Sequence, residues 1–276
     1  MAEPPLVSVV VRSKDESASI GRTLDLLAGQ SIADRAEVIV VDSGSTDGTT
    51  DIVREHGVQL IEIPAASFTF GGSLNTGTDA ASAPVVVALS AHAFPRDDSW
   101  LERMLAAFDD DRVAAACGDG FDYDGAPLAR PRIQDAELAA RNPYWGYSNA
   151  VGGYRRELWR RHPFRPDMPG AEDKEFAWHW QQQGHVVLID PALLVDHDHS
   201  HDPLPDVYVR ARREALGFAM YLDLEPYPLR ALAREWWIER GSWRSHTHAR
   251  LSPLRAIQLL GKYAGRRAGA RLQVRA

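Results

Sequence analysis

Several groups of polar side chains are spaced as binding or proton-transfer chemistry requires. Glu172 and Asp173 stand together at the predicted start of a helix, and a paired carboxylate can remove a proton from a hydroxyl group. Three histidines alternate with other residues over 197–201, so they would point to one side of an extended chain. Charged and hydroxyl side chains fill residues 12–16 and 42–47, where a carboxylate can accept a hydrogen bond from a base N–H or a ribose hydroxyl.

Strands and helices that alternate along the chain must position these groups. Short apolar runs predict strands over 7–11, 37–41, 58–63 and 85–89, and periodic apolar residues predict helices over about 17–29, 47–56 and 100–108. This alternation is typical of an α/β fold with a mostly parallel sheet flanked by helices. Ligands of such sheets bind beyond the carboxyl ends of the strands, which here indicates residues 12–16, 42–48 and 90–95.

The composition excludes several classes of protein. Of the 276 residues, 45% are hydrophobic and 25% charged, as in ordinary globular proteins, and no apolar run is long enough for a membrane helix. The single cysteine, Cys117, excludes an intrachain disulfide and favours a cytoplasmic location. Neither G-x-G-x-x-G nor G-x-x-x-x-G-K-[ST] occurs, so these dinucleotide and P-loop sites have no support.

The charge divides the chain into an acidic and a basic region. Residues 1–200 carry 17 Lys and Arg against 31 Asp and Glu, whereas residues 201–276 carry 14 against 7. We expect one domain over 1–202 and a helical C-terminal lobe over 203–276, with helices over 210–222 and 229–238. The basic lobe could be a solvated surface, a peripheral membrane contact or a homodimer contact, whereas the acidic body argues against nucleic acid.

The order and spacing of the motifs resemble family 2 glycosyltransferases of the GT-A (Rossmann-like) fold. The likeness lies in VSVVVRSKDESASIGRTLDLL, EVIVVDSGSTDGT, FTFGGSLNTGTDAA, VVALSAHAFPRDDSWL and PGAEDKEFAWHWQQQGHVVLIDPALLVDHDHSH, and covers about residues 6–200. It is strongest to the rhamnosyltransferase-like branch. The resemblance implies inverting transfer of a sugar from a nucleoside diphosphate, here a UDP- or dTDP-sugar, to a hydroxyl of a glycan, a lipid-linked sugar or a small natural product.

The resemblance also assigns roles to individual residues. Asp173 matches the family's catalytic base, and Glu172 would orient the acceptor or the sugar. Both carboxylates could instead only favour the helix N-terminus electrostatically. The nucleotide-binding positions by the same matches are Arg12, Ser13, Asp15, Glu16, Asp42, Gly71, Asn75, Ser90 and Ala91. Asp15 replaces the usual asparagine, and Asn75 could alternatively cap a helix or stabilise a turn.

The metal-binding motif departs from the family pattern. Ser90-Ala91-His92 stands where the family has Asp-x-Asp, and His92 matches the aspartate that binds Mg²⁺ or Mn²⁺. Imidazole is a poor ligand for Mg²⁺ but an acceptable one for Mn²⁺. Either His92 binds a divalent metal together with His197 or His199, or histidine and arginine side chains offset the diphosphate charge without a metal.

The segment between these motifs contains candidates for the donor or acceptor pocket. Trp145 could pack its ring on the apolar face of a sugar or belong to the core, and Asn149 could bind sugar hydroxyls. Arg155 belongs to an Arg-Arg pair that is common in the family. The missing Asp-x-Asp motif also leaves an alternative function, a degenerate protein that binds a nucleotide sugar or a glycan without transferring it.

Overall fold

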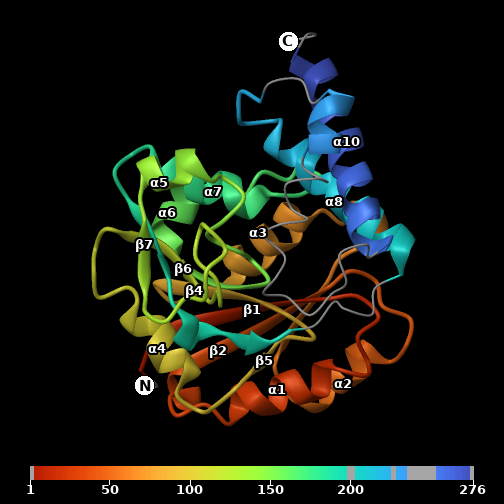
Figure 1. Ribbon diagram of the computed structural model, residues 1–276. Helices are drawn as coiled ribbons and strands as arrows, with labels where there is room; N and C mark the ends of the chain where they lie inside the picture. The colour runs from red at the N-terminus through yellow and green to blue at the C-terminus, as the bar shows by residue number, and fades with distance from the viewer. Residues whose placement is uncertain (1–2, 198–202, 225–227, 235–252, 274–276) are drawn as a thin grey trace. The chain divides into compact units, whose positions relative to one another are not determined.

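A computed structural model describes residues 3–197, 203–224, 228–234 and 253–273 (Figure 1). The chain divides into two compact units. The first comprises residues 1–166 and 173–197, and the second comprises residues 167–172 and 198–276. The segment 167–172, which we expected in the first domain, therefore groups with the C-terminal residues.

The first unit is built on an eight-stranded sheet with the order β3-β2-β1-β4-β8-β6-β9-β7. Its strands are β1 Val7–Ser13, β2 Ala36–Asp42, β3 Gln59–Glu62, β4 Val85–Ser90, β6 Val113–Cys117, β7 Arg132–Gln134, β8 Val151–Arg155 and β9 Val186–Ile189. Strands β7 and β8 pair antiparallel with their neighbours, and the other strands run in one common direction. The predicted mostly parallel α/β sheet is confirmed; the antiparallel strands were not predicted.

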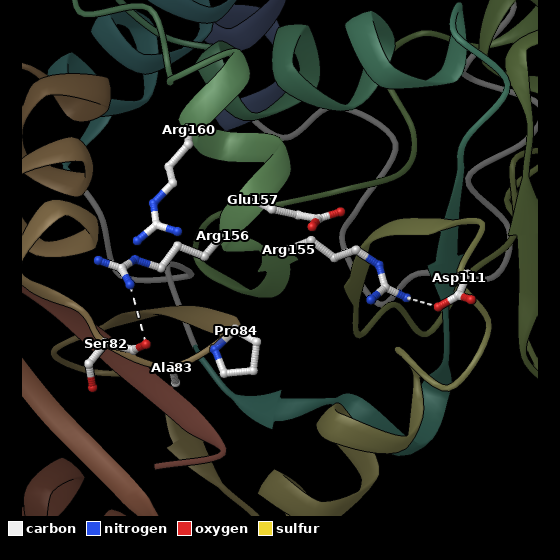
Figure 2. A pocket seen from close by; sticks show the side chains of 8 residues that line it. All are labelled: Ser82, Ala83, Pro84, Asp111, Arg155, Arg156, Glu157 and Arg160. Atoms are coloured by element: carbon white, nitrogen blue, oxygen red, sulfur yellow. Dashed lines mark hydrogen bonds and ion pairs between the residues drawn. The ribbon is translucent and has the colours of Figure 1, made fainter. Parts of the chain in front are cut away.

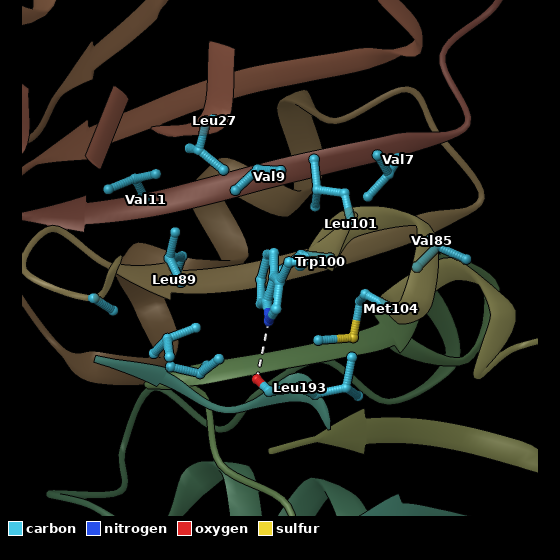
Figure 3. Packing of buried hydrophobic residues seen from close by; sticks show 14 of the residues in the cluster. Val7, Val9, Val11, Leu27, Val85, Leu89, Trp100, Leu101, Met104 and Leu193 are labelled. Atoms are coloured by element: carbon cyan, nitrogen blue, oxygen red, sulfur yellow. Dashed lines mark hydrogen bonds between the residues drawn. The ribbon is translucent and has the colours of Figure 1, made fainter. Parts of the chain in front are cut away.

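Helices cover both faces of this sheet because its central strands are apolar on both sides. On one face, Val7, Val9 and Val11 of β1 pack against helices α1 Ile20–Ala28, α2 Thr49–Glu55 and α4 Trp100–Ala106. Figure 3 shows Trp100 at the centre of this layer, where its indole Nε1 donates to the carbonyl oxygen of Leu193 at 2.9 Å. The other face packs against α3 Phe70–Ala80, α6 Arg156–Arg161 and α7 Glu172–Gln181.

Short elements complete this unit. They are α5 Ala136–Arg141, the two-residue strands β5 Phe94–Pro95 and β10 Val195–Asp196, and the 3-10 turns η1 Ala33–Arg35, η2 Ala65–Ser67 and η3 Pro191–Leu193. Strands β5 and β10 pair antiparallel in a small separate sheet. This pairing brings the chain just after β4 next to the chain just after β9.

Helix α3 was not predicted, because three of its residues are glycines with low helix propensity. Tertiary packing explains why glycines occupy two of these positions. A Cβ added to Gly77 would lie 2.3 Å from a Val10 methyl carbon in β1, and one added to Gly71 would lie 2.7 Å from the Arg165 carbonyl oxygen. The glycines therefore let α3 approach the sheet and the 164–165 segment closely.

The second unit contains two helices that pack against each other, α8 Leu204–Phe218 and α10 Pro253–Gln273. Their backbones approach closely at two glycines of α10. A Cβ on Gly261 would lie 2.6 Å from the Tyr208 carbonyl oxygen, and one on Gly265 would lie 2.2 Å from that of Arg212. Within the described residues, no helix is long and apolar enough to cross a membrane.

The helices expected in the lobe agree only in part with the structure. Helix α8 begins six residues before the predicted start of the 210–222 helix and ends at Phe218. Residues 229–234 are helical, but the remainder of the helix expected over 229–238 lies outside the described residues, as do all three tryptophans of the lobe.

The close approach of α3 to β1 predicts that side chains at position 77 destabilise the fold. Gly77→Ala should lower the free energy of unfolding by about 1–3 kcal/mol, despite the higher helix propensity of alanine, because Val10 is fully buried and must move. Gly77→Val should cost more. Chemical denaturation measures both.

Gly29→Ala is the matched control. An added Cβ there would make only an ordinary contact of 3.5 Å, so the change should stay within about 0.5 kcal/mol. Equal stability of Gly77→Ala and the wild type would show that α3 does not pack as closely as described.

Candidate functional site

The carboxyl ends of three neighbouring strands lie in one row. Ser13 at the end of β1 pairs in register with Asp42 at the end of β2, and Arg12 pairs with Ser90 at the end of β4. The loops that follow these strands therefore start at the same edge of the sheet. Ser90 is half-buried, and the Ala91 carbonyl oxygen accepts a hydrogen bond of 2.7 Å from the Thr23 hydroxyl.

Hydrogen bonds join the loops after β1 and β2. The backbone amide of Asp15 donates to the Ser45 hydroxyl at 2.7 Å, and Asp15 Oδ1 accepts from the Thr46 amide at 2.8 Å. Asp15 has φ 52°, a left-handed conformation that asparagine and aspartate tolerate better than most residues. The Thr46 and Lys14 bonds lower the pKa of its carboxyl group. Asp15 therefore fixes the spacing of the two loops.

Asp42, which we expected to contact the base, is fully buried. Its Oδ1 accepts from the backbone amides of Gly44 at 3.0 Å and Ser45 at 2.8 Å, and its Oδ2 accepts from the Ser45 hydroxyl at 2.5 Å. The carboxylate thus shapes the loop after β2, and these bonds use three of its roughly four acceptor positions.

Glu16 connects the loop after β1 to the loop after β4. Its Oε2 accepts from the Ser19 hydroxyl at 2.6 Å, and its Oε1 lies 2.8 Å from Nδ1 of His92. Burial raises the pKa of this carboxyl group, but the bonds from His92 and Ser19 outweigh burial, so that its pKa is lowered. A carboxylate in this position favours the tautomer with the proton on Nδ1 of His92, which leaves Nε2 with a lone pair.

The two described histidines that we predicted as metal ligands lie side by side. The rings of His92 and His197 are nearly parallel, with 4.8 Å between their centroids. The pairing of β5 with β10 and the 2.9 Å ion pair between Arg96 and Asp196 hold the two segments together. His199 lies outside the described residues.

The two described imidazoles fit a borderline metal better than Mg²⁺, because imidazole is a poor ligand for Mg²⁺ but an acceptable one for Mn²⁺ or softer ions. Glu16 behind His92 is the carboxylate–histidine arrangement that supports metal-bound histidines. Across the described residues, no group of three or more His, Cys, Asp or Glu side chains could hold a metal ion. The described donors can therefore supply only part of a coordination sphere.

The predicted base lies next to the row of strand ends. Asp173, in the first turn of α7, is half-buried, and its Oδ2 accepts from the Asn149 backbone amide at 3.1 Å. The carbonyl oxygen of Asn149 in turn accepts from an Arg12 guanidinium nitrogen at 3.3 Å. Glu172 is buried at the start of the same helix. The chain passes between the two units at this dipeptide.

Buried polar groups without a hydrogen-bond partner among the described residues gather around this edge. They are the side-chain oxygen and nitrogen of Asn149, the hydroxyl groups of Ser13 and Ser43, and the Tyr147 hydroxyl. Burial is the largest of the causes that raise the pKa of Tyr147, and the Asp173 charge contributes. Such groups are costly unless a ligand or water binds them, so they indicate a binding edge.

Trp145 lies beside the same loop and is only partly buried. Its indole Nε1 donates to the Phe121 carbonyl oxygen at 2.9 Å, and its ring meets that of Tyr123 edge-on at 6.2 Å. The ring is therefore fixed in orientation by its partners but is not part of the central core. This arrangement is compatible with contact to a sugar.

Arg155 is a correction. It pairs with Val85 at the amino end of β4, at the edge of the sheet opposite to Ser90. Its guanidinium group donates to the carbonyl oxygens of Val113, Phe108 and Asp110 at 2.8–2.9 Å. Arg155 therefore fixes the chain around β6 and does not lie in the donor or acceptor pocket.

Asn75 and Gly71 have structural contacts that the resemblance did not indicate. The Asn75 side chain donates to the Phe164 carbonyl oxygen at 2.7 Å and accepts from the Trp159 indole at 2.8 Å and the Phe164 amide at 3.1 Å. Its amide is thus used to hold the 164–165 segment against α3, which favours the structural interpretation of this residue.

Lys174 was missed in the sequence analysis. Its Nζ donates to the Gly146 carbonyl oxygen at 2.9 Å, so it ties α7 to the loop before Asn149. The chain has only three lysines, and the position of one of them directly after Asp173 was the available signal. Thr49 was also missed; it accepts from the Glu16 amide at 2.8 Å.

Solved structures of similar fold include a mannosyltransferase. A mannosyltransferase from Pyrobaculum calidifontis, in complex with GDP-Man and Mn²⁺, superposes with a TM-score of 0.67 at 19% identity and covers 99% of this chain and 89% of its own. The S. aureus TarS 1–349 structure gives a TM-score of 0.57 at 17% identity, with 97% and 91% covered. These similarities show the fold and confirm the GT-A expectation.

Curated relatives include two enzymes of the predicted branch. The O-antigen chain rhamnosyltransferase WbaN of Salmonella anatum is 26% identical over 185 residues, and RfbN of Salmonella typhimurium is 22% identical over 215 residues. The matches span 61% and 71% of this chain, and 58% and 68% of those proteins. The model of the family described as "Glycosyl transferase family 2" matches residues 8–168. The chain thus belongs to glycosyl transferase family 2, as the resemblance predicted, and two of its curated relatives are rhamnosyltransferases.

Proposed function

We propose that the chain transfers a sugar from a UDP- or dTDP-sugar to a hydroxyl group of an acceptor, with inversion at the anomeric carbon and with Asp173 as the base. The observation that carries this proposal is the path from Arg12 through Asn149 to Asp173. It places a carboxylate next to the edge where the strand ends leave buried polar groups unpaired.

The transfer step then has defined partners. The acceptor oxygen forms a bond to the anomeric carbon, the bond from that carbon to the diphosphate oxygen breaks, and the acceptor proton moves to an Asp173 oxygen. The Asn149 and Lys174 backbone amides, at 3.1 and 2.8 Å, hold the two oxygens of this carboxylate in place. A base held in this way is oriented before the acceptor binds.

The leaving diphosphate requires positive charge. We propose that His92 and His197 hold a divalent cation, and that Glu16 orients His92. When bound, such an ion stabilises the charge of the departing nucleoside diphosphate. The Mn²⁺ in the P. calidifontis mannosyltransferase structure supports this proposal by analogy of fold. If no metal is required, Arg12 and the two imidazoles would supply the charge instead.

The acceptor side includes the Trp145 ring. Its fixed, partly exposed face could stack on an acceptor sugar, because aromatic faces pack against the apolar faces of pyranose rings. The rhamnosyltransferase relatives act on O-antigen chains, which supports a glycan or lipid-linked acceptor as the substrate class for this protein.

Exchange of the base carboxylate separates binding from chemistry. Asp173→Asn should lower the rate of transfer by about 10²- to 10⁴-fold, because the amide cannot take up the proton. Nucleotide affinity should change little. Product formation by mass spectrometry measures the first effect, and calorimetric titration of the nucleoside diphosphate measures the second.

The exposed Asp109→Asn is the charge-matched control and should keep full activity. Retention of more than about half of the activity in Asp173→Asn would remove Asp173 from the role of base. If the wild type binds nucleotide but transfers no sugar from any UDP- or dTDP-donor, the chain is a degenerate binder.

Removal of the Glu16 charge tests the support of His92. Glu16→Gln should weaken Mn²⁺ affinity by about 10- to 100-fold, the usual effect of removing a carboxylate partner from a metal-bound histidine. Titration with Mn²⁺ followed by electron paramagnetic resonance measures the free ion directly, without any need for catalytic turnover.

His56→Gln is the control, because His56 makes a similar 3.2 Å contact with Asp25 on an exposed surface away from the strand ends. Equal Mn²⁺ affinity in Glu16→Gln and the wild type would exclude this role of Glu16. Nucleotide binding that persists unchanged in EDTA would instead support the arrangement without metal.

A further inference from the structure

A pocket of about 510 Å³ lies in the first unit, away from the strand ends described above (Figure 2). It is lined by Ser82, Ala83, Pro84, Asp111, Arg155, Arg156, Glu157 and Arg160. Arg155 pairs with Val85, whereas Ser90 lies five residues further along β4, or about 17 Å away at about 3.3 Å per residue. The pocket and the row of carboxyl ends therefore occupy opposite edges of the sheet.

The guanidinium groups of the three arginines in the pocket differ in their hydrogen bonds and ion pairs. Arg155 donates through Nε and Nη2 to three carbonyl oxygens and lies 3.8 Å from Asp111, so most of its donors are used within the fold. Arg156 donates at long distances, 3.2 Å to the Ser82 carbonyl oxygen and 3.4 Å to that of Asp79, and its Nε is buried without a partner among the described residues. Arg160 is exposed, and the structure shows no hydrogen bond or ion pair for it among those residues.

Among the described residues, Arg156 and Arg160 thus form no ion pair with a carboxylate. Burial lowers the pKa of Arg156, and the nearby Arg160 guanidinium lowers it further. The Glu37 and Asp79 carboxylates raise the pKa of Arg156, but these effects are smaller than those of burial and Arg160. Glu37 Oε1 accepts hydrogen bonds from Ser8, Ser82 and the Ala83 amide. Asp111 lies near Arg155, so Glu157 is the one lining carboxylate left to balance Arg156 and Arg160. An anion bound between these two arginines would reduce the repulsion between their charges.

The chemistry of the two side chains defines the ligand. Guanidinium groups bind phosphate oxygens through paired N–H donors, and two of them favour a phosphomonoester or diphosphate over a single carboxylate. A volume of about 510 Å³ lies in the range of small-molecule sites and exceeds what a bare phosphate fills. The ligand would therefore carry an organic group next to the phosphate.

We propose that Arg156 and Arg160 form a second, non-catalytic binding site for a phosphate ester at the edge of the sheet opposite to the strand ends. The phosphate could belong to a soluble ester or to a lipid headgroup, because the same oxyanion is presented by both. The proposal does not depend on the identity of the base or of the metal ligands.

Arg160→Gln is the decisive variant, because Arg160 makes no contact in the described structure that folding would lose. Calorimetric titration of the full chain with inorganic pyrophosphate should show two classes of site, since the nucleotide-binding edge also accepts a diphosphate. In Arg160→Gln, the Kd of one class should rise at least about tenfold, while the other class stays unchanged.

Arg161→Gln is the matched control on the same helix. It removes the same charge, but its side chain lies over the Trp180 ring at 4.9 Å and does not line the pocket. An equal rise of the pyrophosphate Kd in Arg160→Gln and Arg161→Gln would show that general surface charge causes the effect. That result would overturn the proposed binding site. A single class of pyrophosphate site in the wild type, unaffected by Arg160→Gln, would overturn it as well.

Vesicle sedimentation distinguishes the two sources of the phosphate. Binding to vesicles of phosphatidylcholine with phosphatidic acid, absent with phosphatidylcholine alone and lost in Arg160→Gln but not in Arg161→Gln, would assign the site to a lipid headgroup. Pyrophosphate binding that depends on Arg160, without any vesicle binding, would assign it to a soluble phosphate ester.

Discussion

Hydrogen bonds join the loop after β1 to the loop after β2, and the shape of the candidate site depends on these bonds. Asp15, Asp42 and Asp47 accept hydrogen bonds from the backbone and hydroxyl groups of the facing loop or of their own, so that neither loop is shaped alone. Bonds from Thr49 and Ser17 lower the pKa of Asp47, which is therefore charged at neutral pH. Because β1 and β2 are parallel and in register, both loops begin at the same edge of the sheet. The hydrogen bonds of Asp15 and Asp47 then determine the distance between the loops.

Periodicity and apolar runs were sufficient to predict the first half of the fold. The strands over 7–11, 37–41, 58–63 and 85–89 all exist. Three of them contain runs of buried residues, whereas the strand over 58–63 lies at the edge of the sheet and is only partly buried. The helix over 70–80 could not be predicted in this way. Its glycines lower helix propensity, and their use appears only when the neighbouring strand and the 164–165 segment are in place.

The structure brings together the predicted site residues that follow strand ends, whereas positions that depend on strand direction could not be read from the sequence. Glu16, His92 and His197 were named from their motifs, but only the folded chain shows that they form one contiguous group. The sequence analysis expected Arg155 in the donor or acceptor pocket. Arg155 is the last residue of β8, and because β8 runs antiparallel to β4, this residue lies at the amino end of β4, opposite to Ser90. The spacing of motifs along the sequence does not show whether a strand is parallel or antiparallel to its neighbours.

The main chain and the side chain of Asn149 have separate contacts. Its backbone amide holds Asp173 and its backbone carbonyl oxygen holds Arg12, while its side chain is left for another partner. The orientation of the proposed base, Asp173, is therefore encoded by main-chain atoms that every amino acid except proline provides. Relatives could exchange the side chain at position 149 without losing the two main-chain contacts that orient this carboxylate.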